Sequence, residues 1–448
     1  MEGGNTRQNG KLKKCITSFD AMFYVVGFVI GSGIFMKPAI VLQNSGSSAM
    51  ALIAWIIGGV MALTAALTVG ELASHIPKLG GMHAYLIDLY GDTFGFLYGW
   101  TESIISCPAS SAGLAIAFAT FATFFVPLGD WELKIVAITV IIAITAAQIA
   151  STRYGVWLQV AATVGKLLPM VAIVAFGLAK GTVGDISFLT DGITPGKGVG
   201  AALLGVVWAY DGWLSCCTLG SEMEDSQRGL PRALVGGVAF VMVVYILFNI
   251  GIFNVLPATA VVASKRIGID VSLKLFGNIG TTIIALGMLV SVFGALNAQI
   301  TVGTRYFFSM GSRNQIPGSK FLSTVTSKES TPINSLIAHA IVSILFILSG
   351  TFNSVTDLAI FTIWIFYTIG VGGIFVLRKR ETEDNRGKLY HVPLYPIVPI
   401  IAVLGGSFML ISAVRSNFTH SMVGILLTVI GLPLYYYQKK KSAAKAIE

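Results

Sequence analysis

The chain has 448 residues, of which 54% are hydrophobic and 11% are charged. Soluble domains carry about 25% charged residues, so this composition excludes an ordinary soluble protein. In a soluble protein, the formal net charge of +9 would suggest a nucleic-acid partner. Basic loops on one side of a membrane explain that charge better here, and we expect no nucleic acid to bind.

Apolar stretches of roughly 20 residues, the length that crosses a bilayer as a helix, recur along the chain. These stretches are continuous rather than alternating, so the sequence predicts helices, each of which satisfies its own backbone polar groups. The predicted spans are 18–43, 47–74, 92–126, 132–150, 156–179, 200–224, 233–257, 279–310, 333–350, 355–377, 394–414 and 420–437. We therefore expect an all-α integral membrane protein with about twelve transmembrane helices in the lipid bilayer.

The distribution of basic residues predicts the orientation of these spans. An even number of spans places both termini on one side of the membrane. The loops and tails on that side hold 21 of the 30 Lys and Arg residues, and the opposite side holds 8. Under the positive-inside rule, the tails 1–17 and 438–448 are cytoplasmic, in the inner (plasma) membrane.

The first span is interrupted in its middle by Gly31, Ser32 and Gly33, followed by Ile34. Glycine tolerates backbone conformations that other residues resist, so an unwound turn is expected here. Such a turn frees N–H groups at the start of the next half-helix, and these donors suit a carboxylate. The alternative is close helix packing by small residues, which is common in membranes.

Three charged residues fall within or at the ends of the next spans. Glu71 ends the second span and Glu102 begins the third, so we expect both at the membrane interface. Lys166 lies near the middle of the fifth span, where a lysine costs about 2.5–3.5 kcal/mol on insertion scales. Its ammonium should be paired, and it either replaces a bound sodium ion electrostatically or serves as a structural bridge between helices.

The sixth span is interrupted at Tyr210, Asp211 and Gly212, between Trp208 and Trp213. A break at this depth exposes carbonyl groups that suit an ammonium group, and the aromatic neighbours could form a gate or a side-chain pocket. The alternative is an aromatic packing turn. The carboxylate of Asp211 is costly at this depth unless it faces an aqueous cavity or local backbone donors.

Polar side chains also lie along the eighth span. Ser291, Asn297 and Gln299 either contribute to a pocket or make ordinary hydrogen bonds between helices. The segment 258–278 before this span is mildly amphipathic and is expected on the outer surface. The sequence contains no cluster of histidines with metal-ligand spacing, and we expect no metal and no cofactor.

The two interrupted spans are separated by five spans, which places them in opposite membrane orientations. This spacing is typical of an inverted repeat, in which paired broken helices indicate the transport site. The predicted repeats are 18–179 and 200–377, followed by two further helices over 394–437.

Four runs carry a resemblance to a known family. They are GSGIFMKPAIVL (31–42), GELASHIPKLGGMHAYL (70–86), WAYDGW (208–213) and SEMEDSQRGLPRAL (221–234). Over essentially all twelve spans, the chain resembles the L-type amino acid transporters of the amino acid–polyamine–organocation superfamily. Among these it is similar to bacterial serine/threonine and alanine–serine–cysteine exchangers. The resemblance implies a LeuT-type 5+5 inverted repeat plus two C-terminal helices, and sodium-independent exchange of neutral amino acids.

The resemblance also implies roles for individual residues. The implied substrate-binding residues are Val29, Ser32, Gly33, Ile34, Trp208, Ala209 and Asp211. The implied coupling residues are Gly31, Lys166, Tyr210 and Ser291. Backbone donors at 32–34 would meet the substrate carboxylate, and carbonyls around Val29, Trp208 and Asp211 would meet its amino group. Lys166 matches the lysine that fills the place of a sodium ion in sodium-coupled relatives.

The chain departs from the family pattern at three places. The loop 126–134 lacks the cysteine that ties animal members to an ancillary glycoprotein, so we expect no disulfide-linked heavy chain. Trp208 stands where many relatives have phenylalanine, and Asp211 stands where many have glycine. A tryptophan there would narrow the side-chain pocket, which favours small substrates such as alanine, serine, threonine and cysteine.

We therefore expect an exchanger (antiporter) of small neutral L-amino acids that works by alternating access. The alternative with the same fold is a proton-coupled symporter or uniporter in which Lys166 or Asp211 titrates. A membrane enzyme or an amino-acid sensor is disfavoured, because the sequence shows neither a catalytic cluster nor a soluble output domain.

Overall fold

The computed structural model describes most of the chain. Its described residues are 17–76, 80–150, 154–184, 186–189, 192–194, 196–221, 223, 225–325, 331–380 and 389–445, without the side chains of 154–166, 218–221 and 442–445. Lys166 therefore has a described backbone, but its side chain lies outside the described residues.

The described residues fold as helices joined by loops. In chain order the helices are α1 (Ser18–Val29), α2 (Gly33–Met36), α3 (Pro38–Ser45), α4 (Ser48–His75), α5 (Met82–Tyr90), α6 (Asp92–Thr101), the π-helix η1 (Glu102–Ser106), α7 (Cys107–Ala122), α8 (Asp130–Ala150), α9 (Tyr154–Lys180), α10 (Val199–Tyr210), the 3₁₀-helix η2 (Trp213–Ser221), α11 (Ser226–Val255), α12 (Ala258–Ala263), α13 (Ile267–Ser312), α14 (Ser319–Leu322), α15 (Ile333–Ser349), α16 (Phe352–Arg380), α17 (Ile397–Ser416), α18 (Phe418–Val429) and α19 (Gly431–Lys445).

In the described part of the chain, ten helical segments are long and apolar enough to cross a membrane. Two shorter apolar helices, Leu167–Lys180 and Ile333–Ser349, occupy the fifth and ninth positions among them. Together these segments correspond to the twelve predicted spans. The prediction of an all-helical membrane protein is confirmed.

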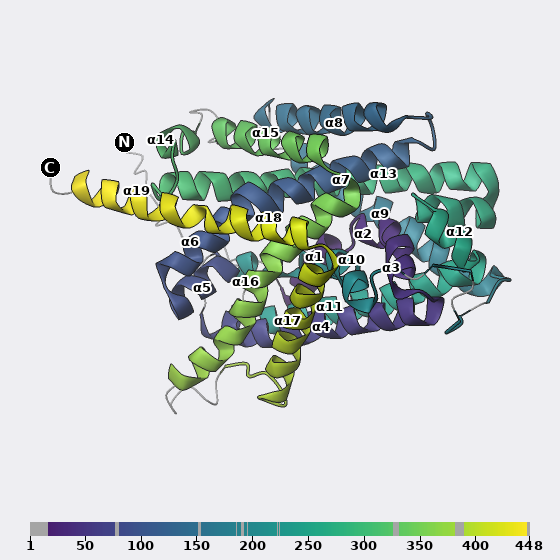
Figure 1. Cartoon of the computed structure of the whole chain (residues 1–448), viewed down its shortest axis with the longest axis horizontal. Coiled ribbons are helices and arrows are strands. Elements are labelled where there is room, and N and C mark those ends of the chain that lie inside the picture. The colour runs from purple at the N-terminus through teal and green to yellow at the C-terminus, as the bar shows by residue number, and fades with distance from the viewer. Residues whose placement is uncertain are drawn as a thin grey trace, which may run out of the picture.

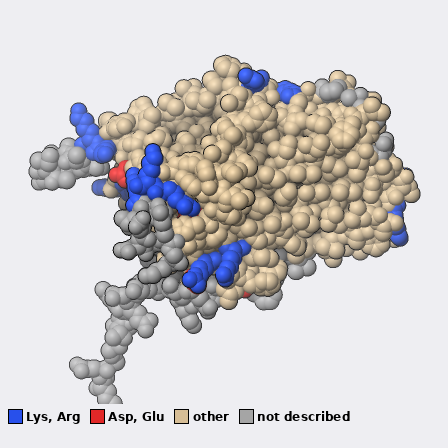
Figure 2. Space-filling view, turned by 90° about the horizontal axis from the view of Figure 1, so that it is seen from below, with Lys and Arg blue, Asp and Glu red and all other residues tan. Residues whose placement is uncertain are grey.

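The long helices pack side by side, and charge is concentrated at their ends. In Figure 1, α5, α6, α14 and the end of α19 lie at the left, and α3 and α12 lie at the right. We call these the α19 end and the α12 end of the molecule. Figure 2 shows Lys and Arg gathered at the α19 end, with fewer at the α12 end and a broad uncharged surface between them. Exposed residues such as Ile135, Val171, Ile279 and Leu404 suit contact with lipid on the molecule's outer surface.

The first and sixth spans are both broken in the middle of the bundle. The helix of the first span stops at Val29 and resumes at Gly33, and that of the sixth stops at Tyr210 and resumes at Trp213. The first half of each span packs against the second half of the other: α1 contacts η2, and α10 contacts α2 and α3. The two broken helices therefore run in opposite directions, as an inverted repeat requires.

Two glycines permit this crossing. A Cβ atom at Gly33 would lie 2.7 Å from the Cα atom of Ala209, so α2 and α10 approach too closely for a side chain at residue 33. Gly212 adopts a φ of +105°, a backbone conformation that L side chains rarely take, and a Cβ atom there would lie 3.0 Å from the Phe28 ring. The glycines at both breaks are therefore required by the geometry.

Three local features bear on the predicted spans. The label α13 covers two helices joined across a kink at Gly277 (φ 63°, ψ −169°), so the predicted start of the eighth span near residue 279 agrees with the structure. The side chains of Glu71 and Glu102 are buried within the protein, with 0% and 6% exposed. Glu71 is neutralised by Arg378 of α16, and Glu102 lies where a π-helix widens the third span.

Candidate functional site

A cavity of about 80 Å³ lies between the two helix breaks. A volume of this size holds more than one water molecule and is suited to a small ligand. Six of the predicted site residues line it: Val29, Gly31, Ser32, Gly33, Trp208 and Asp211. Its remaining lining residues come from α1, α7, α13 and the second break: Gly27, Phe28, Ser110, Leu114, Gly212, Ala295, Ala298 and Gln299.

One wall of this cavity offers hydrogen-bond donors. The first N–H groups of a helix have no partner within the helix, and in α2 these belong to Gly33 and Ile34. Lys37, which follows α2, has helical backbone angles (φ −83°, ψ −21°), so the helical path continues from α2 into α3. The buried Ser32 hydroxyl has no hydrogen-bond partner among the described residues. This wall can bind a carboxylate.

Another part of the cavity lining offers hydrogen-bond acceptors. Asp211 has an extended backbone (φ −72°, ψ 161°) at the end of α10, so its carboxyl group is carried out of the helix. Within the described part of the chain, its Oδ1 atom is buried without a hydrogen-bond partner. A short distance away, the carboxyl group of Glu102 accepts hydrogen bonds from the Tyr98 hydroxyl (2.9 Å) and the Cys107 thiol (3.2 Å). Two carboxyl groups on one side of the site favour a positively charged group or a proton.

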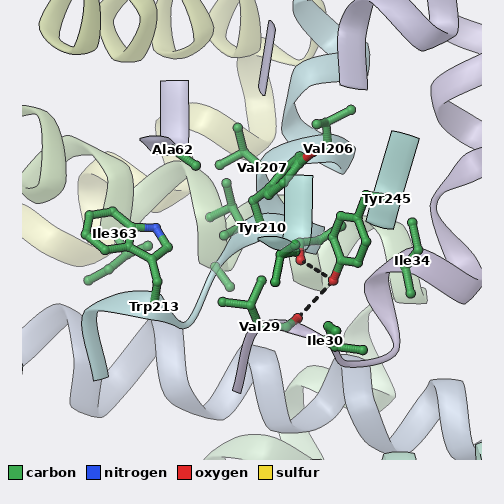
Figure 3. Packing of buried hydrophobic residues seen from close by; sticks show 14 of the residues in the cluster. Val29, Ile30, Ile34, Ala62, Val206, Val207, Tyr210, Trp213, Tyr245 and Ile363 are labelled. Carbon is green, nitrogen blue, oxygen red and sulfur yellow. Dashed lines mark hydrogen bonds between the residues drawn. The ribbon is translucent and has the colours of Figure 1, made fainter. Parts of the chain in front are cut away.

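The two breaks are tied together by Tyr245 of α11 (Figure 3). Its hydroxyl lies 3.1 Å from the Val29 carbonyl oxygen and 3.0 Å from the Ala209 carbonyl oxygen. Both carbonyls belong to the last turn of a broken helix, so they lack the partner that an unbroken helix would supply. Tyr245 therefore holds the ends of α1 and α10 in one geometry with a single shared donor.

The remaining predicted residues of the breaks lie in the packed core around Tyr245. Ile34 and Ala209 are buried, and their side chains do not line the cavity. The Tyr210 ring packs 5.1 Å from the Tyr245 ring, and its hydroxyl donates to the Trp55 carbonyl oxygen at 3.3 Å. Of the aromatic residues at this break, Trp208 is the one that faces the cavity.

The cavity adjoins a larger vestibule of about 270 Å³. Phe28, Ser110, Asp211, Gly212 and Gln299 line both spaces. The vestibule extends between the residues that precede α5, the start of the third span and the last turns of α13. These segments lie at the α19 end, so the vestibule lies between the cavity and that end of the molecule.

A histidine lies on the vestibule wall near its mouth. His83 begins α5, outside the membrane spans, and its Nε2 atom lies 3.4 Å from an Arg313 side-chain nitrogen. Burial and, second, the Arg313 charge lower the pKa of His83 to about 4. This imidazole is therefore neutral at neutral pH, and Arg313 and Arg305 supply the positive charge of the vestibule.

On the side towards the α12 end, the cavity is covered by two aromatic rings, those of Trp208 and Phe352, which we call the roof. The Trp208 ring meets the Phe352 ring of α16 edge to face, with centroids 6.4 Å apart. Beyond Phe352 lies the side chain of Lys37, which is 0% exposed. The sequence interpretation missed this residue. A lysine inside the apolar stretch 18–43 was the available signal.

Two predicted coupling residues remain. The side chain of Lys166 lies outside the described residues. Ser291 on α13 is buried, and its hydroxyl has no hydrogen-bond partner in the described part of the chain. Of its neighbours along α13, Asn297 accepts a hydrogen bond from Gln148 at 2.8 Å, whereas Gln299 lines the cavity.

One cluster elsewhere has the composition of a metal site. Side-chain ligand atoms of Glu71, His75 and His391 lie within 4.8 Å of one another. The Glu71 carboxylate, however, is already bonded to the Arg378 guanidinium at 2.9 Å and to the Val392 N–H group at 2.6 Å. A guanidinium at this position opposes a divalent cation, so the cluster reads as an ion-pair network that joins α4 to α16.

Comparison with known proteins agrees with this architecture. Residues 16–432 match the family model described as "Amino acid permease". The chain is 36% identical over 441 residues to the serine/threonine exchanger SteT of Bacillus subtilis (strain 168), covering 98% of this chain and 100% of that protein. It is 29% identical over 434 residues to the b(0,+)-type amino acid transporter 1 of Mus musculus, covering 95% and 88%. It is 27% identical over 436 residues to the human cystine/glutamate transporter, covering 95% and 85%.

The bridge made by Tyr245 yields a prediction for stability. In Tyr245→Phe, two buried carbonyl groups lose their donor, and an unsatisfied buried group costs about 1–3 kcal/mol. Tyr210→Phe is the matched control, because the Trp55 carbonyl lies within α4 and keeps its helical partner. We expect a larger loss of thermal stability in purified Tyr245→Phe than in Tyr210→Phe. Equal stabilities of the two variants would contradict the role given to Tyr245.

Proposed function

The chain belongs to the amino acid permease family, and from this premise we propose that it exchanges small neutral L-amino acids by alternating access. It is a multi-pass membrane transporter and not an enzyme. Exchange, the size class of the substrate and the individual site residues are the parts that we propose.

The observation that carries the proposal is the polarity of the cavity between the breaks. The cavity lining holds N–H donors at the start of α2, the Ser32 hydroxyl and the carboxyl group of Asp211. A free amino acid carries a carboxylate and an ammonium on the same carbon atom, so it complements the donors and the acceptors at once. We therefore assign the carboxylate to the backbone of 32–34 and the ammonium to Val29, Trp208, Ala209 and Asp211.

The size of the cavity supports small substrates. Its volume is about 80 Å³, and the Trp208 ring fills the side towards Phe352. Alanine, serine, threonine and cysteine have side chains small enough for such a site. The name of the Bacillus subtilis relative, a serine/threonine exchanger, supports the same substrate class.

The difference in access to the cavity from the two ends of the molecule supports transport by alternating access. The cavity opens into the vestibule towards the α19 end, whereas the rings of Trp208 and Phe352 cover it towards the α12 end. We propose that the α19 end, which is rich in Lys and Arg, is cytoplasmic in the plasma membrane. The structure would then be the inward-facing state, with residues 18–179 and 200–377 as the two repeats that move against each other.

Two features bear on the driving force. We propose that the Lys166 ammonium replaces a sodium ion, which would make transport sodium-independent. Gly31, Tyr210 and Ser291 are proposed to transmit binding at the breaks to the neighbouring helices. The second candidate is proton-coupled transport, which is favoured by the Asp211 carboxyl beside Glu102.

A disulfide-linked heavy chain is not expected, because the loop between α7 and α8 contains no cysteine.

Purified protein in liposomes tests exchange directly. We expect labelled L-serine or L-alanine to enter vesicles preloaded with unlabelled serine, because the loaded transporter returns more readily than the empty one. Entry should be slow into empty vesicles. Equal entry into loaded and empty vesicles would contradict exchange.

An imposed pH gradient separates the two candidates. Pure exchange moves no net proton, so uptake into loaded vesicles should respond little to the gradient. Strong acceleration by a proton gradient, abolished by Asp211→Asn, would support proton coupling instead.

The role of Lys166 can be tested on the same assay. Lys166→Met removes the charge with little loss of volume, and we expect the exchange rate to fall by roughly tenfold or more, as when about 1.4 kcal/mol of stabilisation is lost. Lys180→Met, at the exposed end of the same helix, is the control and should exchange normally. A folded Lys166→Met with the parental exchange rate would refute the role.

A further inference from the structure

Lys37 has an unusual position for a charged residue. It lies at the junction of α2 and α3, one turn beyond the first helix break, and its side chain is fully buried. Its Nζ atom donates to the Asn353 side-chain oxygen (3.1 Å), the Thr356 hydroxyl (2.8 Å) and the Asp357 carboxylate (3.0 Å). An ammonium group has three donors, and all three are therefore used.

The same side chain also reaches an aromatic ring. The Nζ atom lies 5.1 Å from the centroid of Phe352, a distance at which a cation is attracted to the ring face. Phe352, Asn353, Thr356 and Asp357 all belong to the first turns of α16. One lysine thus binds four side chains on a single end of one helix, which we call the α16 cap.

The contacts of Lys37 with the α16 cap stabilise the closed arrangement, and they can be broken and formed again. A buried ammonium is costly without partners, so separation of Lys37 from the α16 cap would be resisted while the site stays dry. Asp357, however, is 38% exposed, so water already reaches one member of the pair. If the α12 end opens, hydration can replace each lost hydrogen bond as the two sides part.

The α16 cap is connected to the candidate substrate cavity through two rings. Phe352 meets Trp208 edge to face at 6.4 Å, and Trp208 lines the cavity. Trp208 also packs against Gly33, where a Cβ atom would lie 3.1 Å from the indole ring. Phe352 therefore contacts both Lys37 and Trp208, and it links the buried ammonium to the cavity lining.

We propose that Lys37 is a positioning residue that holds the transport site closed towards the α12 end. By binding the α16 cap, it keeps Phe352 against Trp208 and thereby keeps the roof over the substrate. Opening of that side requires the ammonium to leave its three acceptors. The inference rests on the proposed function for its meaning in transport, but the closure itself can be measured without any substrate.

Sided labelling of a cysteine beneath the roof tests the closure. Leu114 lines the cavity, so Leu114→Cys in a chain whose four native cysteines are replaced by alanine is the reporter. Intact cells are treated with a small membrane-impermeant thiol reagent. Cysteines at the exposed Lys197 and Lys441 mark the α12 end and the α19 end, and they establish which end faces the outside. If Lys441→Cys is the one labelled in cells, the same labelling is performed on inverted vesicles.

We expect Lys37→Met to raise the labelling rate of the reporter from the α12 end by roughly tenfold, because the rate follows the population of the open state. Lys37→Arg retains the charge and should restore slow labelling. Lys134→Met is the matched control, because Lys134 also donates to a carbonyl (Leu348, 2.9 Å) and lies 5.3 Å from a ring centroid (Trp131), yet does not line the cavity. This control should label slowly, like the parent.

An abundant, monodisperse Lys37→Met that labels at the parental rate would overturn the proposal. If that variant does not fold, Asp357→Asn weakens the same bond with little change of shape, and parental labelling there would equally overturn it. The labelling needs no amino acid, so its outcome is independent of the exchange assay. Faster labelling in a chain that does not exchange amino acids would retain the closure and reject the proposed function.

Discussion

Two helices of this protein stop in the middle of the membrane, and every backbone group released there needs a partner. In lipid, no water is available to compensate a lost helical hydrogen bond, so the breaks at Val29 and at Tyr210 constrain everything around them. Two acceptors are satisfied by one protein group: the Tyr245 hydroxyl lies between the Val29 and Ala209 carbonyl oxygens. The donors at the start of α2 face a cavity instead. The protein thus leaves open the groups that an amino acid can satisfy.

The surroundings of this cavity determine its access. Towards the α19 end it continues into a vestibule whose wall carries Glu102 and Asp211, which would attract the ammonium group of a leaving or arriving substrate. Towards the α12 end it is covered by Trp208 and Phe352, behind which Lys37 is bound to the first turns of α16. Packing and charge therefore close the cavity on one side and leave it accessible on the other. Transport by alternating access requires this difference, and in the other state the open and closed sides are exchanged.

The features that could be predicted from the sequence are those encoded locally. Span length follows from apolar runs, and the breaks follow from the glycines near residues 31–33 and 212. The rest depends on contacts between distant segments. Lys37 stands out as a lysine within the first apolar stretch, but its partners lie on α16, more than 300 residues later. Tyr245 carries no signal within its apolar helix, and nothing local distinguishes Tyr210, which faces the core, from Trp208, which faces the cavity. The burial of Glu102 could not be predicted locally either, because it depends on a π-helix and on a hydrogen bond from Tyr98.

An experimental structure with L-serine bound would test the central claim most directly. The account predicts ligand density between the two breaks, with the carboxylate within about 3 Å of the N–H groups of 32–34 and the ammonium towards Val29 and Asp211. The density should lie beneath Trp208, with Tyr245 still bonded to the ends of α1 and α10. Serine bound elsewhere, for example in the vestibule beside Arg313 with the cavity between the breaks unoccupied, would contradict the account.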